Sequence, residues 1–100
     1  MVVGDDRQRY ISFIIESVEI DRRGMIDAIR DEFSSEEYED IEPWLTVFKG
    51  DRGIVRCNHT GKEGAIEILN QIEIEGGRVK TLVTSGTIKK AKKALKKYEG

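Results

Sequence analysis

The stretch WLTVFKGDRGIVRCN, residues 44–58, decides the fold. Residues 44–49 and residues 52–58 are two short runs rich in β-forming residues, and only Gly50 and Asp51 separate them. Two such runs joined by a two-residue turn are typical of a β-hairpin. The middle of the chain is therefore predicted to hold two neighbouring antiparallel strands.

A strand and a helix are predicted before this hairpin. Apolar side chains recur at every second position in residues 9–17 (RYISFIIES), which is typical of a strand with one buried face. Asp21 is suited to cap a helix, and apolar residues then recur at helical spacing to about residue 34. Seven of the twelve residues 31–42 are acidic and Pro43 follows them, so we expect the helix to give way to a solvated connector.

A second helix, a fourth strand and a third helix are predicted after the hairpin. Thr60 and Glu63 have the spacing of a capping box, and apolar residues follow at helical spacing to Ile72. Beyond Gly76 and Gly77, residues 78–84 have the composition of a strand and residues 87–98 that of a helix. This order predicts an α+β fold of ferredoxin-like type: a four-stranded antiparallel sheet with two helices on one face, and an extra C-terminal helix.

Size and composition restrict the class of protein. A chain of 100 residues makes one domain, which we expect to span residues 9–98 after a flexible N-terminal lead, residues 1–8. Hydrophobic residues make up 38% of the chain in short runs, which indicates a globular protein without a membrane span. Cys57 is the only cysteine and His59 the only histidine, so we expect neither an intrachain disulfide nor a zinc site, and a cytoplasmic location.

The charges are distributed unevenly along the chain. Residues 1–77 contain 9 Lys or Arg against 18 Asp or Glu, whereas residues 78–100 contain 8 against 1. Phosphate groups respond to charges within roughly a Debye length of 8 to 10 Å, so a local basic patch can bind nucleic acid even in an acidic protein.

The predicted last helix carries most of the basic charge. Helical spacing places six lysines on one face and apolar residues on the other; the lysines are Lys89, Lys90, Lys92, Lys93, Lys96 and Lys97. A solvated amphipathic helix would explain this pattern, and so would a surface that binds an acidic protein or membrane. We favour contacts to nucleic-acid phosphates, which release counterions and give salt-sensitive affinity.

Two further features indicate phosphate contacts. Residues 84–87 (TSGT) form a turn before the last helix, where backbone N–H groups and the hydroxyls of Ser85 and Thr87 could receive a phosphate, although an ordinary helix cap would have the same sequence. A period of two places Arg52 and Arg56 on one face of their strand, where they could contact RNA or pair with acids such as Glu16.

The aromatic and catalytic signals are weaker. The string RGIVRCN lacks the stacking aromatics of an RNA-recognition motif, Trp44 is interpreted as a core or rim residue, and Tyr10 could either stack on a base or pack under the last helix. Neither a nucleophile motif nor a phosphate-binding loop of an NTPase is present in the sequence. We therefore expect no catalytic residues and no metal ligands in this chain.

Three strings together resemble archaeal ribonuclease P protein component 2: RYISFII (residues 9–15), RGIVRCN (residues 52–58) and TLVTSGTIKKAKK (residues 81–93). The similarity extends over most of residues 9–97. It implies a non-catalytic subunit that, paired with ribonuclease P protein component 3, supports the catalytic RNA in removing 5′ leaders from transfer RNA precursors. Magnesium would then act at the RNA, and the protein itself would bind no cofactor.

We therefore expect an accessory subunit of the endoribonuclease ribonuclease P, with eight residues at the RNA: Arg52, Arg56, Lys80, Ser85, Thr87, Lys89, Lys90 and Lys93. The main alternative is a ferredoxin-like protein-interaction or small-ligand module, in which the acidic connector and the basic helix pair in a homodimer. An acylphosphatase-like enzyme is less favoured, because residues 19–23 lack the glycines and hydroxyls of a phosphate loop.

Overall fold

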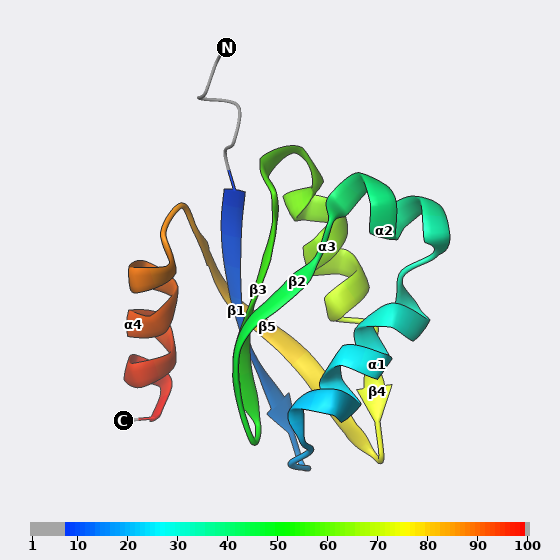
Figure 1. Cartoon of the computed structure of the whole chain (residues 1–100). Helices are drawn as coiled ribbons and strands as arrows, with labels where there is room; N and C mark the ends of the chain where they lie inside the picture. Colours follow the sequence, from blue (N-terminus) through cyan, green and yellow to red (C-terminus); the bar gives the residue numbers. More distant parts are fainter. Residues whose placement is uncertain (1–7, 100) are drawn as a thin grey trace.

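The computed structural model describes residues 8–99 and shows an α+β arrangement with one five-stranded antiparallel sheet (Figure 1). The strands lie in the order β2-β3-β1-β5-β4. Their bounds are β1 (Gln8–Glu16), β2 (Trp44–Lys49), β3 (Arg52–Asn58), β4 (Glu73–Ile74) and β5 (Gly77–Ser85). The helices are α1 (Arg22–Glu32), α2 (Ser35–Ile41), α3 (Lys62–Leu69), α4 (Ile88–Glu99) and a 3-10 turn, η2 (His59–Gly61).

The hairpin prediction is confirmed. Strands β2 and β3 have the predicted bounds, and Lys49 lies opposite Arg52 across the two-residue turn. Gly50 adopts a φ of 66°, a left-handed conformation that costs glycine little because it has no Cβ. The alternation predicted for β1 holds in part: Ile11, Phe13 and Ile15 lie in the main core, but Ser12 and Ile14 on the other face are buried as well, so the prediction of a single buried face was wrong.

The predicted number of strands was wrong. A short fifth strand, β4, pairs with the start of β5 through a turn at Glu75 and Gly76, which have φ angles of 49° and 87°. Two consecutive positive φ angles are characteristic of the tight turns that match the twist of a hairpin. The sequence suggested only a glycine-rich connection here, because two residues are too short a run to show a period of two.

The acidic segment was predicted to be a solvated connector, but it contains a helix. Within it, Ser34 and Glu37 form a capping box: the Ser34 hydroxyl accepts from the Glu37 N–H at 3.1 Å, and Glu37 Oε1 accepts from the Ser34 N–H at 2.9 Å. Helix α2 follows, and its last residue, Ile41, is only 6% exposed. A capping box, the buried Ile41 and the partly buried Tyr38 therefore hold a short helix whose acidic side chains are exposed.

The capping box predicted at Thr60 and Glu63 does not form. Asn58 instead caps the preceding turn η2, where its side-chain oxygen accepts from the Gly61 N–H at 2.7 Å, and α3 begins after Gly61 without a side-chain cap. The Asn58 amide also donates to the Asp40 carbonyl oxygen of α2. This asparagine therefore connects the end of β3 to both helices.

The sheet separates two apolar layers. The larger core lies between the sheet and α1, α2 and α3, and includes Phe13, which stacks on Phe48 with ring centroids 6.3 Å apart. The smaller core lies on the other face, where Ala91 and Leu95 of α4 pack on Ile54. Figure 1 shows the same division, with α4 on one side of the sheet and α1, α2 and α3 on the other.

Candidate nucleic-acid interface

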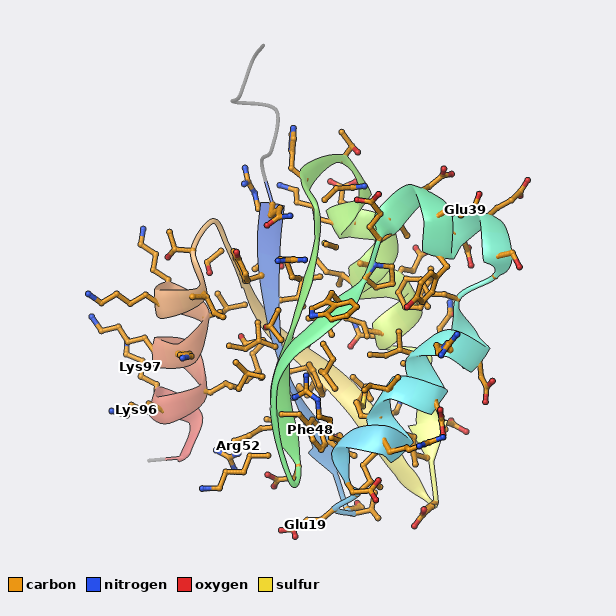
Figure 2. All side chains as sticks on the ribbon, in the orientation of Figure 1. Glu19, Glu39, Phe48, Arg52, Lys96 and Lys97 are labelled. Carbon is orange, nitrogen blue, oxygen red and sulfur yellow. The ribbon has the colours of Figure 1, made fainter. Side chains whose placement is uncertain are left out.

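The amphipathic pattern of α4 is realised as predicted. Ala91 and Leu95 are 0% and 7% exposed against the sheet, and all six lysines of the helix are exposed. In Figure 2 the side chains of Lys96 and Lys97 extend from α4 away from the sheet. The apolar face thus docks the helix, and the lysine face is left to the solvent.

Arg52 and Lys80 lie on the same side of the sheet as α4. In the sheet register both residues pair with Ile14 from opposite sides, and residues paired directly across strands project to the same face. Two strand spacings place their backbones about 10 Å apart. Arg52 also forms an ion pair with Asp51, its Nε atom lying 3.1 Å from Oδ1.

Arg56 and Ser85 occupy a second row on this face. Both pair with Tyr10, four residues along β1 from Ile14, which corresponds to about 13 Å. Ile54, the floor of the α4 core, lies midway between the two arginines of β3. Helix α4 therefore packs between two rows that each contain a basic side chain.

These residues and the lysines of α4 make one surface, which we call the basic layer: Lys49, Arg52, Arg56, Arg78, Lys80, Lys89, Lys90, Lys92, Lys93, Lys96 and Lys97. Glu16, opposite Arg78, and Asp51 offset part of this charge. The exposed carboxylates of α2 lie on the opposite side of the sheet from the basic layer. Figure 2 shows Glu39 on the far side of the molecule from Lys96. The uneven charge along the sequence thus becomes a charge separation between the two faces of the sheet.

The hydroxyls of the turn before α4 form hydrogen bonds within the turn and to the first turn of the helix. The Ser85 hydroxyl donates to the Thr87 carbonyl oxygen at 2.8 Å, and the Thr87 hydroxyl accepts from the Lys90 N–H at 3.3 Å. Thr87 is therefore a helix cap, as the ordinary interpretation of this sequence required. Phosphate binding by Ser85 and Thr87 stays a prediction.

The two aromatic residues that the sequence left open have different surroundings. Tyr10 is partly buried and packs against the small core beneath α4. Of the two roles that the sequence allowed, the structure therefore shows packing under α4 and not a ring free to stack on a base. Trp44 is not a core residue, because 59% of its surface is exposed. It stands at the start of β2, an edge strand of the sheet.

Sequence reasoning missed Lys49. It is exposed and lies opposite Arg52 in the hairpin, so it extends the row of Arg52 and Lys80 to the sheet edge. The signal was available, because a two-residue turn at Gly50 and Asp51 fixes the residues on either side of it as a pair.

Cys57 is buried in the main core at 1% exposure, and this burial raises the pKa of its thiol from 9.0 to about 11, while Arg9 and Lys62 act in the opposite direction. Because the pKa of Cys57 is higher in the folded state, the free energy of unfolding does not depend on this thiol below pH about 9. It falls as the pH rises from about 9 to about 11, by about 2 to 3 kcal/mol in total.

We expect Cys57 to react with Ellman's reagent at pH 8 at least about 100-fold more slowly in the folded protein than in urea, since the thiolate is the reactive form. Stopped-flow absorbance measures both rates. Equal rates would show that the thiol is accessible.

Neither a metal cluster nor a membrane-spanning helix occurs in the part of the chain that the structure describes. No group of three or more His, Cys, Asp or Glu side chains among residues 8–99 is arranged to hold a metal ion. Within the same residues, every helix is too short or too polar to cross a membrane.

Comparison with known proteins shows what this fold resembles. No protein-family model matches the chain, and a search of curated proteins gave no match either. Among solved structures, a chain in the cryo-EM structure of yeast ribonuclease MRP is similar at a TM-score of 0.69 and 16% sequence identity. The similarity covers 94% of this chain and 92% of that chain, so the two chains share their fold over nearly their full lengths.

Proposed function

We propose that this chain is an accessory protein subunit of ribonuclease P, of the archaeal component 2 type, which supports the catalytic RNA in removing 5′ leaders from transfer RNA precursors. The observation that carries the proposal is the basic layer, in which the α4 lysines and the sheet residues Arg52, Arg56 and Lys80 lie on one side of the molecule. Such a surface suits an RNA backbone better than it suits a small ligand.

The contacts that we propose are mainly electrostatic. Lysine side chains on an exposed helix bind phosphates as mobile point charges, without reading bases. Tyr10 is packed beneath α4, so this face offers little for base stacking. The protein would therefore stabilise the shape of a structured RNA through contacts to the RNA phosphate backbone, independently of the RNA sequence.

The fold comparison supports a ribonucleoprotein setting. The similar chain belongs to a structure of yeast ribonuclease MRP, which as its name says is a ribonuclease. The order β2-β3-β1-β5, with α1 and α3 on one face, supports a ferredoxin-like arrangement to which β4, α2 and α4 are additions. Both points agree with the resemblance of the sequence strings to component 2.

The partners that we propose follow from this assignment. They are the ribonuclease P RNA, on the basic layer, and the ribonuclease P protein component 3, with a second copy of this chain as a further candidate, all in the cytoplasm. Magnesium would act at the RNA, and we assign no catalytic residue to this chain.

Reconstitution tests the proposal. The purified protein alone should leave a transfer RNA precursor intact in magnesium, whereas adding it with component 3 to ribonuclease P RNA should raise the rate of leader removal. Leader removal by nuclease-treated protein alone would contradict the assignment. So would a rate with RNA that does not change when the protein is added.

A further inference from the structure

A groove lies at the β2 edge of the sheet, and its two arginines belong to α1, which covers the face away from α4. Its volume is about 240 Å³, and it is lined by α1, by Tyr38 of α2 and by the start of β2. Arg22 forms part of its wall, where its guanidinium donates to the Leu45 carbonyl oxygen at 2.7 Å. The lining residues are Arg22, Ile26, Ile29, Arg30, Tyr38, Pro43, Trp44 and Leu45.

The groove is basic although the part of the sequence that forms it is acidic. Residues 1–77 contain 18 acids and 9 basic residues, yet the groove is lined by two arginines and by no acid. Apolar and aromatic side chains make up the rest, and Trp44 leaves 59% of its surface exposed there. Large apolar surface with arginines at its rim is the composition of a protein-binding hot spot.

Helix geometry sets the spacing that an occupant must match. Arg22, Ile26 and Arg30 are four residues apart on α1, so they follow one side of the helix, and the two arginines are separated by about 12 Å along its axis. An extended chain rises about 3.3 Å per residue, so about four residues cover this distance. Alternate residues of an extended chain project to one side. Acid, apolar and acid side chains at alternate positions would therefore face Arg22, Ile26 with Trp44, and Arg30.

We propose that this groove binds an extended segment of a partner protein, in which a large apolar side chain lies between two carboxylates at alternate positions. A short segment of this kind fits the local positive charge. A long phosphate backbone would run on to the carboxylates of α2, whose Glu39 lines the next hollow together with Arg30, and would be repelled there. The site does not depend on the proposed RNA function, because its two arginines belong to α1 and not to the basic layer. Trp44, which pairs with Arg56 across β2 and β3, stands at the edge of the sheet.

Trp44 reports the binding directly. It is the only tryptophan of the chain and it lines the groove, so its emission should move to shorter wavelength when a segment covers it. The probes are short synthetic peptides with glutamate, an apolar residue and glutamate at alternate positions among serines, with leucine, isoleucine, methionine or phenylalanine at the centre. A matched peptide with lysines in place of the glutamates should bind at least about tenfold more weakly.

Variants separate this proposal from the RNA function. Arg30→Glu should weaken binding of the acidic peptides at least about tenfold and leave RNA affinity unchanged, whereas Arg30→Lys should retain most of the peptide affinity. Lys93→Glu, on α4, should do the reverse: it should lower RNA affinity and leave peptide binding as it is. Circular dichroism checks that all three variants are folded.

Two outcomes would overturn the proposal. The first is an unchanged Trp44 emission with every acidic peptide at about 1 mM, which would show that the groove has no useful affinity for such segments. The second is an Arg30→Glu variant that binds the peptides normally and loses RNA affinity, which would assign the groove to nucleic acid.

Discussion

Replacing Lys89, Lys93 and Lys96 by Gln should lower the affinity of the protein for structured RNA by about two orders of magnitude in 0.1 M salt. Each lost phosphate contact reduces the slope of log K against log salt by roughly 0.7 to 0.9, so three lost contacts reduce the slope by about two units. Such contacts are largely screened at about 1 M salt, where the two proteins should bind equally, so at about 0.1 M they should differ by about two units of log K. The three lysines are exposed on successive turns of α4. The loss should be the same for unrelated RNA sequences, because phosphates carry no sequence information. A gel-shift titration across a range of salt concentrations measures it.

The matched control removes the same charge from the opposite side of the molecule. Arg23, Arg30 and Lys62 lie on α1 and α3, so their replacement by Gln changes the net charge equally without touching the basic layer. This variant should retain nearly the affinity and the salt slope of the unmodified protein. Equal losses in the two variants would mean that net charge, not the α4 face, controls the binding.

Leu95→Ala should destabilise the protein by roughly 2 to 5 kcal/mol, the range observed when a buried leucine is truncated. Leu95 is 7% exposed and forms, with Ala91 and Ile54, the small core that holds α4 on the sheet. That core has few members, so few neighbouring side chains can move in to fill the cavity that the truncation leaves. Urea denaturation followed by circular dichroism gives the free energy of unfolding.

Lys92→Ala is a suitable comparison for Leu95→Ala. It lies on the same helix and is exposed, so its effect on stability should stay within about 0.5 kcal/mol. A Leu95→Ala variant as stable as Lys92→Ala would show that α4 is not docked on Ile54. The lysine face would then have no fixed position relative to Arg52 and Arg56.

Much of the fold could be predicted because its signals are local. The period of two in β1, the turn at Gly50 and Asp51, and the amphipathic face of α4 each require only neighbouring residues to interpret. The same local rules failed where tertiary contacts decide the outcome. Helix α2 exists because Ile41 reaches the core from an acidic segment. Asn58, which also bonds to Asp40, caps the turn η2, so α3 begins after Gly61 and not at a Thr60 cap.

The candidate site was predictable in part for the same reason. A period of two correctly placed Arg52 and Arg56 on one face, and helical spacing correctly grouped the lysines of α4. That both sets lie on the same side of the sheet depends on α4 folding back over Ile54, which no local pattern specifies. The groove beside Trp44 was missed because it joins α1, α2 and β2, three segments whose relative positions appear only in the folded chain.

Amide chemical-shift mapping tests most directly the central claim, that RNA binds the basic layer. Adding a structured RNA to the isotopically labelled protein should perturb the amides of α4 and those of Arg52, Arg56 and Lys80, and should leave α1, α2 and α3 unchanged. At 11.4 kDa the protein is small enough for every strand and helix to be followed. Perturbations that fall on α1 and α2 while α4 stays unchanged would contradict the account.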